Sequence, residues 1–280
     1  MLHCDYDKNN GGWQPPRIAP IEPFQLDPAN ATLHYAIECF EGAKAYRDHA
    51  DPESVKMFRI NKNFERMNSS HKQLGFPQFN VDEMVECTRQ LLELDKDWIP
   101  NRPMHSMYIR PNSIAMDNKL GLSSIKKMKT FVCLSPVGPY YPRGFVPVKL
   151  YCDTQIVRAW PKGFGDKKVG GNYAPTLKVG RKGNEHYGCD QALWLLHDYV
   201  TEVGTMNIFC FWKNEKGEDE LITPPLDGTI LPGITRDSIL NLARGFKEFK
   251  VTEKVFKIQE VIKAVDEGRL YEIFGSGTAA

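Results

Sequence analysis

The alternation of apolar and polar residues predicts several short β-strands spread along the chain. VKMFRI alternates in the way of a half-buried strand. A polar run, KNEKGEDE, separates two apolar runs and predicts a hairpin connection to the following LIT. The strands are expected at Val55–Ile60, Val148–Cys152, Ala192–Leu196 and Ile208–Trp212.

A helical period replaces this alternation in three other segments. The clearest helix begins after Asn80, a good N-cap with Glu83 at the capping-box position. Two more helices are predicted over Thr235–Phe246 and Ile258–Gly268, the second stopped by its terminal glycine. The core-facing positions expected in the first helix are Val81, Met84, Val85, Leu91 and Leu92. Those expected in the last helix are Ile258, Val261, Ile262 and Val265.

Strands and helices are mixed without regular βαβ alternation, so the predicted fold class is α+β rather than a doubly wound sheet. The stretch KTFVCLSPVGPYYPRG (residues 129–144) has the composition of a strand followed by a loop rich in proline and glycine. This loop is the best candidate for a domain linker. The sequence therefore predicts one domain over residues 1–134, an interdomain loop over 135–146 and a second domain over 147–280.

Composition excludes several classes of function. The formal net charge is +1, so the chain has no electrostatic footprint for nucleic acid or an anionic membrane. The seven cysteines and seven histidines are scattered, which argues against a disulfide framework and against a metal site. No apolar run approaches the roughly 20 residues of a membrane span, and the first residues do not resemble a signal or transit peptide. We therefore expect a cytoplasmic protein, or a mitochondrial one if a targeting segment precedes this sequence.

Candidate chemistry begins with two adjacent lysines in a glycine-rich stretch, GFGDKKVGGNYAPT (residues 163–176). In an extended segment neighbouring side chains point to opposite faces, so Lys167 and Lys168 cannot both face one pocket. An inward lysine is costly unless its charge is paired, neutralised or used covalently, and this easily shifted pKa is the basis of Schiff-base chemistry. On local grounds a solvated surface loop is the simpler explanation, and the pattern does not decide which lysine acts.

Three other stretches offer weaker signals. GTILPGITRDS (residues 228–238) places a Pro-Gly turn at the start of a helix, and FGSGTAA (residues 274–280) offers glycine backbone and hydroxyl groups. Glu202 lies before an apolar run and, if buried, needs a cationic or protonated partner such as a pyridinium N–H. A plain turn, a flexible tail and a solvated glutamate are the ordinary alternatives. Together with a lysine, these groups are what a phosphate-bearing pyridine aldehyde requires.

Longer motifs across nearly the whole chain resemble the branched-chain amino-acid aminotransferases, pyridoxal-phosphate enzymes of class IV and fold type IV, in particular their eukaryotic branch. The matching motifs include LHYAIECFEGAKAY, RAWPKGFGDKKVGGNYAPT, TEVGTMNIF and YEIFGSGTA, in the family's order. The resemblance implies two α/β domains with pyridoxal 5′-phosphate at their interface, and a homodimer. It also implies that residues 1–134 are the small N-terminal α/β domain and residues 147–280 the large cofactor-binding domain, shortened at its C-terminal end relative to the family.

The resemblance assigns cofactor-binding roles to individual residues. Lys168 matches the catalytic lysine that forms an aldimine with the cofactor. Tyr173 matches the tyrosine on the cofactor's phenolic oxygen, and Glu202 the glutamate on its pyridine nitrogen. Arg66 matches the arginine that binds the phosphate. The remaining matches are Ile234, Thr235 and Thr278 around the phosphate, and Thr205 in the cofactor pocket.

The implied reaction is reversible transamination of branched-chain L-amino acids with 2-oxoglutarate, in biosynthesis or in catabolism. Lys168 would act as general base and acid on the substrate's α-proton. One pocket must then accept both an aliphatic side chain and a γ-carboxylate. The substrate-pocket matches are Tyr35 and Phe40 as an apolar wall, Tyr108 and Arg110 for placing carboxylates, and Tyr140 in a loop that resembles a flexible lid.

Two alternatives stay open at this point. Another fold-type IV enzyme, such as a D-amino-acid aminotransferase or an aminodeoxychorismate lyase, is one, although the long matches in GGNYAPT and FEGAKAY argue against it. A truncated, non-catalytic homologue is the other, because the chain ends just past GSGT, where related enzymes continue. The segment Arg110–Leu122 differs from the family's usual acidic run, so no preference among leucine, isoleucine and valine is predicted.

Overall fold

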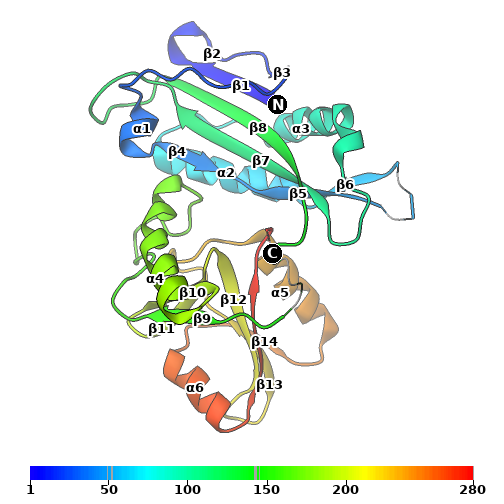
Figure 1. Cartoon of the computed structure of the whole chain (residues 1–280), viewed down its shortest axis with the longest axis vertical. Helices are drawn as coiled ribbons and strands as arrows, with labels where there is room; N and C mark the ends of the chain where they lie inside the picture. The colour runs from blue at the N-terminus through cyan, green and yellow to red at the C-terminus, as the bar shows by residue number, and fades with distance from the viewer. Residues whose placement is uncertain (49, 52, 142–143, 145, 280) are drawn as a thin grey trace. The chain divides into compact units, whose positions relative to one another are not determined.

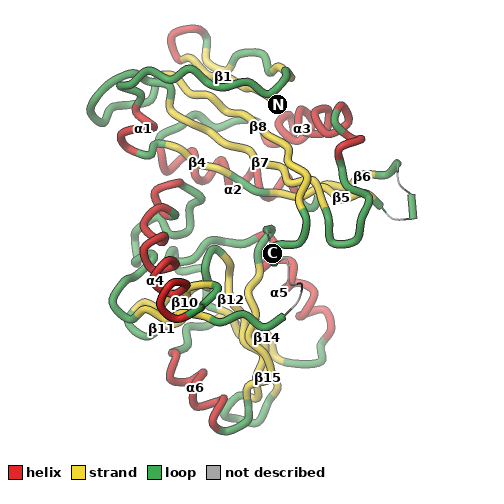
Figure 2. The backbone as a smooth tube through the Cα atoms, viewed as in Figure 1, coloured by secondary structure: helices red, strands yellow, loops and turns green. Residues whose placement is uncertain are grey.

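The computed structural model describes residues 1–48, 50–51, 53–141, 144 and 146–279. They form two units, the first made of Met1–Pro142 with Lys167–Gly171, and the second of Arg143–Asp166 with Asn172–Ala280. Each unit combines one β-sheet with helices, which confirms the predicted α+β class (Figures 1 and 2). The predicted division at residues 134 and 147 stays a prediction, and residues 142, 143 and 145 of the predicted loop lie outside the described part of the chain.

The first unit is built on an antiparallel sheet of eight strands. Its main order is β2–β1–β8–β7–β5–β6, with β3 beside β1 and β4 beside β7. The two long strands β7 and β8 pair along ten residues each and form the centre of the sheet (Figure 1). The strands are β1 (Leu2–Asp7), β2 (Gly12–Trp13), β3 (Arg17–Ile18), β4 (Glu38–Phe40), β5 (Ala43–Arg47), β6 (Val55–Met57), β7 (Ser106–Ala115) and β8 (Lys127–Val137).

Helices α2 (Ile60–Leu74) and α3 (Val81–Leu94) pack against this sheet, and α1 (Ala31–Tyr35) is a short helix that leads into β4. The predicted start of α3 is confirmed, because the Asn80 side chain accepts hydrogen bonds from the backbone N–H groups of Asp82 and Glu83. Its predicted apolar face is also confirmed, since all five residues belong to the core of this unit or pack against it.

The sequence pattern does not predict α2. Four of its seven buried residues are polar, so the apolar period that would reveal a helix is broken. The helix also begins after Arg59, which adopts a left-handed conformation (φ 48°) and provides no side-chain cap. Because Arg59 turns the chain into this helix, the strand expected over Val55–Ile60 ends early, at Met57. The four buried polar residues of α2 are Asn63, Arg66, Ser70 and His71.

The second unit is built on a seven-stranded sheet in the order β14–β13–β12–β11–β10–β9, with β15 paired to β12. Two of its pairs, β9 with β10 and β13 with β14, are parallel, and the others are antiparallel. The β12–β13 hairpin follows the predicted polar connection. The strands are β9 (Leu150–Asp153), β10 (Gln191–Leu196), β11 (Tyr199–Val203), β12 (Met206–Lys213), β13 (Asp219–Thr223), β14 (Lys250–Glu253) and β15 (Leu270–Ser276).

Helices cover both faces of this second sheet. Successive strand residues point to opposite faces, and Leu193 and Leu195 pack in the cluster that includes α6 (Ile258–Asp266). Ala192 and Trp194 pack instead against α4 (Leu177–Tyr187). Helix α5 (Ile234–Phe246) packs on the face to which Phe209 points, through Leu240 and Ala243.

The predicted apolar face of α6 is partly wrong. Ile258 and Val261 face the core, but Ile262 and Val265 are 53% and 56% exposed. Ala264 is buried instead, three residues after Val261, so these two side chains are neighbours on one side of the helix. Within the described part of the chain, every helix is too short or too polar to cross a bilayer.

Candidate active site

Lys168 lies in a short segment that packs against β4 and α2 of the first unit. Its backbone N–H donates to Ser70 Oγ on α2 (3.0 Å), and its carbonyl oxygen accepts from the N–H of Phe40 on β4 (3.0 Å). Val169 adds an isolated β-bridge to Cys39. These contacts fix the backbone of the segment without using the lysine side chain.

The Lys168 ammonium lies 4.7 Å from the centre of the Phe40 ring. Burial lowers the pKa of Lys168 to about 8; the positive charges of Arg66 and Arg110 act in the same direction, and Glu41 opposes them. Taken as a whole residue, Lys168 is half-buried. Lys167 is equally half-buried, which means that exposure does not distinguish the two lysines as the alternation argument expects.

A buried ion pair joins Glu41, in the turn between β4 and β5, to Arg66 on α2. Arg66 Nε and Nη2 donate to the two carboxylate oxygens of Glu41 at 2.7 and 2.8 Å. Asn63 Nδ2, one turn earlier on α2, donates to Glu41 Oε2 (2.9 Å) and to the carbonyl oxygen of Gly42 (3.0 Å). The guanidinium is therefore held by side chains in a bidentate geometry that fixes its plane.

Phe40, Tyr108 and Arg110 form a second cluster in the first unit. The Arg110 guanidinium carbon lies 4.9 Å from the centre of the Phe40 ring and 5.0 Å from that of Tyr108. Its Nη2 donates to Tyr108 Oη (3.1 Å). The turn residue Gly42 leaves the space for this hydroxyl, since a Cβ there would collide with Tyr108 Oη. The cluster presents an exposed cation against aromatic faces, a setting suited to a carboxylate beside an apolar group.

The other two predicted substrate-pocket residues have different described contacts. Tyr35, at the end of α1, accepts a hydrogen bond from the N–H of Gly121 (2.6 Å) and is 38% exposed. Tyr140 packs edge-on against Tyr141, with ring centres 4.8 Å apart. The described contacts thus bring Phe40, Tyr108, Arg110 and Lys168 together but do not join Tyr35 or Tyr140 to them.

In the second unit, a row of residues crosses the sheet in register. Trp194 on β10 pairs with Glu202 on β11, Glu202 pairs with Asn207 on β12, and Asn207 pairs with Ser276 on β15. Paired residues point to the same face, so three buried polar side chains follow a tryptophan on the face that α4 and α5 cover. Ser276 Oγ is buried and makes no hydrogen bond with the described residues.

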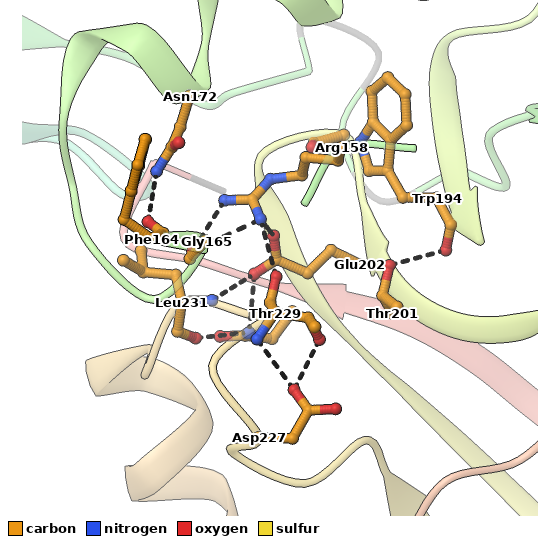
Figure 3. A network of polar contacts seen from close by, with 12 residues as sticks. Arg158, Phe164, Gly165, Asn172, Trp194, Thr201, Glu202, Asp227, Thr229 and Leu231 are labelled. Atoms are coloured by element: carbon orange, nitrogen blue, oxygen red, sulfur yellow. Dashed lines mark hydrogen bonds and ion pairs between the residues drawn. The ribbon is translucent and has the colours of Figure 1, made fainter. Parts of the chain in front are cut away.

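Glu202 is 2% exposed and is held by several donors (Figure 3). Its Oε1 accepts from the backbone N–H of Leu231 (2.9 Å) and from Asn207 Nδ2 (3.2 Å). Its Oε2 lies 2.9 Å from Arg158 Nη1. A solvated strand-edge glutamate, the ordinary alternative, is therefore wrong.

Arg158 points from the loop after β9 toward Glu202 (Figure 3). Besides the ion pair, its Nη1 donates to the carbonyl oxygen of Thr229 (3.1 Å) and its Nη2 to that of Gly165 (3.3 Å). Its side chain is 6% exposed. The sequence pattern does not distinguish Arg158, Asn207 or Glu41 as site residues. A polar residue inside the apolar run MNIFCFW was the available signal for Asn207.

The start of α5 follows directly from this network. Its N-cap is Gly233, which provides no side-chain hydrogen bond, and the helix begins with Ile234 and Thr235. A Cβ at Gly233 would collide with Asn207 Oδ1, so glycine allows the helix start to approach Asn207 closely. Thr278 follows β15, whose Ser276 lies opposite Asn207. The helix start thus presents backbone N–H groups and the positive end of its dipole, a setting that favours an anion.

The last two predicted cofactor residues also belong to the second unit. Tyr173 precedes a short 3₁₀ turn, Ala174–Thr176, and its carbonyl oxygen accepts from Thr176 Oγ1 (2.6 Å). Thr205 is exposed in the tight turn between β11 and β12, which Gly204 (φ 54°) allows. The predicted cofactor residues are therefore divided, with Arg66 and Lys168 in the first unit and the others in the second.

Comparisons with known proteins identify the family of this chain. Residues 38–271 match the family model described as amino-transferase class IV. The chain is 50% identical over its whole length to a branched-chain-amino-acid aminotransferase of Dictyostelium discoideum, of which it covers 73%. It is 48% identical to a cytosolic branched-chain-amino-acid aminotransferase of Caenorhabditis elegans and 46% identical to a mitochondrial one of Mus musculus, again over its whole length, covering 67% and 71% of them.

Solved structures show the same fold. The branched-chain amino acid aminotransferase of Escherichia coli superposes with a TM-score of 0.76 at 28% identity, over 91% of this chain and 79% of that one. A branched-chain amino acid aminotransferase of Thermobaculum terrenum, solved in its PLP form, gives a TM-score of 0.74 at 22% identity, over 99% of this chain and 82% of that one. The chain therefore belongs to the class IV aminotransferase family.

Proposed function

We propose that this protein transfers the amino group of leucine, isoleucine and valine to 2-oxoglutarate, giving branched-chain 2-oxo acids and glutamate, with pyridoxal 5′-phosphate as cofactor. The observation that carries the proposal is the Lys168 ammonium beside Phe40, with a pKa lowered to about 8. The names of the relatives at 46–50% identity support the same substrates.

The residues present fit the proposed cofactor. A pyridine aldehyde with a phosphate group requires an amine, an anion site and an acid or carboxylate for the ring nitrogen. Lys168 is such an amine, Glu202 a buried carboxylate, and Ser276 Oγ a buried hydroxyl without a hydrogen bond to the described residues, two positions before Thr278. The bound cofactor would supply an electron-accepting ring conjugated to the substrate's α-carbon.

Lys168 would carry the proton in this reaction. A pKa of about 8 leaves both the ammonium and the neutral amine populated near neutral pH. The neutral amine can therefore take the substrate's α-proton, and the ammonium can give it back, as a general base and acid should. The aromatic ring of Phe40 beside Nζ excludes water from one side of the amine.

Charged groups from both units would hold the cofactor. In the proposed arrangement Arg66, the backbone N–H groups of Ile234 and Thr235, and the Thr278 hydroxyl bind the phosphate. Glu202 would hold a proton on the ring nitrogen, because a buried carboxylate favours a cationic partner. Tyr173 would donate to the phenolic oxygen, and Thr205 would line the cofactor pocket.

The substrate pocket would combine aromatic and cationic groups. Phe40 and Tyr35 would contact the branched side chain, and Arg110 with Tyr108 would bind a carboxylate. The stacking of Arg110 on Phe40 and Tyr108 supports this, since one surface then offers both an apolar face and a cation. Tyr140 would belong to a loop that covers the pocket.

We further propose a homodimer that acts on small molecules only. The relatives include cytosolic and mitochondrial proteins, and we propose a cytoplasmic location for this one. Sedimentation velocity at several protein concentrations tests the dimer, and a concentration-independent monomer would contradict it.

The central experiment follows the visible absorbance of the purified chain with pyridoxal 5′-phosphate. Wild-type protein should give a band of covalently bound cofactor that shifts when L-leucine is added and returns with 2-oxoglutarate. Borohydride reduction followed by peptide mass spectrometry should locate the cofactor on Lys168. We expect Lys168→Ala to lose the band and to reduce kcat by at least about 10²–10⁴-fold.

Lys167→Ala is the matched control, because it removes the neighbouring lysine from the same segment. It should keep the band and most of the activity. Loss of the band in this variant, or cofactor found on Lys167, would contradict the assignment. A shift caused by D-leucine but not by L-leucine would instead favour a D-amino-acid aminotransferase.

A further inference from the structure

Arg158 occupies a place in the second unit that the proposed function does not explain. Its side chain is buried, Nη1 lies 2.9 Å from Glu202 Oε2, and its guanidinium also contacts the backbone of two loops (Figure 3). We propose that Arg158 is a positioning residue that sets cofactor affinity through Glu202, by keeping this carboxylate ionised and in place. The inference rests on the proposed function, in which Glu202 meets the cofactor's ring nitrogen.

Arg158 places a positive charge beside the buried carboxylate of Glu202. A buried carboxylate without a cation tends to become protonated, and a neutral carboxyl group no longer attracts a pyridinium. Asn207 and the backbone of Leu231, which donate to Glu202, and Trp194, which pairs with it across the sheet, are neutral. Arg158 is a positively charged partner at ion-pair distance from Glu202. Its charge favours the ionised form that the cofactor needs.

Arg158 also helps to fix the loop that leads into α5. Arg158 donates to the carbonyl oxygen of Thr229, and two residues later the N–H of Leu231 donates to Glu202. The segment 229–231 is therefore fixed at two points, one on each member of the ion pair (Figure 3). It continues through Gly233 into the start of α5, where we place the phosphate. The position of Arg158 consequently affects both proposed anchors of the cofactor in this unit.

The shape of the arginine side chain suits position 158 better than that of lysine. The guanidinium group is planar and carries five N–H donors, so one side chain can meet a carboxylate and two carbonyl oxygens at once. A lysine at position 158 would restore the charge but has a single compact ammonium. The two parts of the role can therefore be separated by substitution.

The test compares Arg158→Met and Arg158→Lys with wild type. Cofactor dissociation constants are measured by absorbance titration, and thermal unfolding is measured without cofactor. We expect Arg158→Met to weaken cofactor binding by at least about 10-fold, and Arg158→Lys to recover part of this loss because it restores the charge. A purely structural role would lower the unfolding temperature of both variants without this recovery of affinity. Cofactor binding by Arg158→Met within about 2-fold of wild type would overturn the inference.

A double variant keeps the test decisive if Arg158→Met does not fold. Arg158→Met combined with Glu202→Gln removes both charges, a change that buried ion pairs tolerate better than the loss of one partner. If Arg158 acts through Glu202, the double variant should bind the cofactor within about 2-fold of Glu202→Gln alone. Independent, multiplying effects would overturn the inference.

Glu220→Gln is the matched control. Glu220 is also a buried glutamate of the second unit, but its carboxylate accepts from Trp212 and Thr252, outside the Arg158 network. This variant should lose stability and keep its cofactor affinity. Wild-type protein that fails to bind the cofactor would overturn the proposed function and the inference together. Binding by wild type with an unaffected Arg158→Met would overturn the inference alone.

Discussion

Both units contain a buried glutamate–arginine pair, but the two pairs are built in opposite ways. In the first unit the arginine, Arg66, is the proposed cofactor ligand, and Glu41 supports it through two short hydrogen bonds. In the second unit the glutamate, Glu202, is the proposed ligand, and Arg158 supports it. Each unit therefore buries one charged group that we propose as a cofactor ligand and offsets its burial with an opposite charge.

The supports also differ in kind. Side chains hold the first pair, because Asn63 donates to Glu41, and Glu41 in turn accepts from the guanidinium of Arg66. Backbone groups contribute much of the second, through the N–H of Leu231 and the carbonyl oxygens of two loops. A side-chain support depends on residue identity, whereas a backbone support depends on the course of the loops. The first pair should therefore be the more sensitive to single substitutions.

Removing each arginine tests this difference and should give the largest effects. Arg66→Met leaves Glu41, which is fully buried, without its cation, and we expect a loss of about 3–5 kcal/mol in the free energy of unfolding. Arg158→Met leaves Glu202 with two N–H donors, so we expect a smaller loss of about 2–3 kcal/mol. Urea denaturation, with hydrogen exchange to locate the change in each unit, measures both.

Removing both charges of the first pair is the control. Arg66→Met combined with Glu41→Gln should recover about 1–3 kcal/mol relative to the single arginine variant, because no uncompensated charge remains. The comparison would break if Arg158→Met proved as costly as Arg66→Met, or if the double variant recovered nothing.

Acid should destabilise the first unit more than the second, by slightly less than the loss of Arg66. His71 on α2 is fully buried, and burial lowers its pKa to about 4, although the bond to Pro77 raises it a little. Its Nδ1 donates to the Pro77 carbonyl oxygen (2.7 Å), so Nε2 accepts from Ser113 Oγ (2.8 Å), which in turn accepts from Thr130. These hydrogen bonds suit the neutral ring, and burial disfavours the charged ring.

The pH dependence follows from this shift. Because the unfolded His71, with a pKa near 6.5, binds a proton before the folded one, stability is complete above about pH 6.5 and falls as the pH approaches 4. The loss should reach about 2 kcal/mol at pH 5 and about 3 kcal/mol near pH 4. Burial also lowers the pKa of His3, which adds to the slope in the same unit.

Unfolding free energies at pH 7, 6 and 5 measure the slope, and hydrogen exchange shows where protection is lost. The variant His71→Gln does not titrate and should flatten the profile. An equally steep profile in this variant, or protection lost first in the second unit, would contradict the assignment to His71.

The sequence predicts features that depend on neighbouring residues better than features that depend on residues far apart in the chain. The start of α3 was predictable because Asn80 acts on N–H groups two and three residues away. Lys168 and Glu202 were assigned to the site by the family resemblance, since the local pattern left both open, and their roles remain predictions. Arg158 was not predicted because it donates to a carbonyl oxygen 71 residues away in the chain. The N–H of Leu231 that donates to Glu202 is likewise 29 residues from it. Helix α2 escaped because buried polar residues interrupt its apolar period.

Alanine substitutions at Gly42 in the first unit and Gly233 in the second should lower stability by intermediate amounts. A Cβ at Gly42 would meet the far end of Tyr108, a half-buried side chain that can move. A Cβ at Gly233 would meet Asn207, which is buried and bonded to Glu202 and Leu231. Gly233→Ala should therefore cost about 1–3 kcal/mol, and Gly42→Ala less.

The functional effects of the two glycine variants should differ in kind. Displacing Tyr108 disturbs its bond to Arg110, so Gly42→Ala should raise KM for 2-oxoglutarate by about 10-fold with little change in cofactor affinity. Gly233→Ala should weaken cofactor binding first. Steady-state kinetics and absorbance titrations separate these results, and a reversed pattern would contradict the placement of Arg110 or of the phosphate.

The smallest expected effect compares two helix starts. Asn80 caps α3 with its own side chain, so Asn80→Ala should cost about 1 kcal/mol in urea denaturation and leave cofactor affinity unchanged. Helix α5 begins at Gly233 without a side-chain cap, and we propose that the phosphate takes this role. Adding cofactor should therefore slow hydrogen exchange at Ile234 and Thr235 but not at the start of α3. Equal protection of both starts would mean that the cofactor stabilises the chain generally, and that α5 has no special relation to the phosphate.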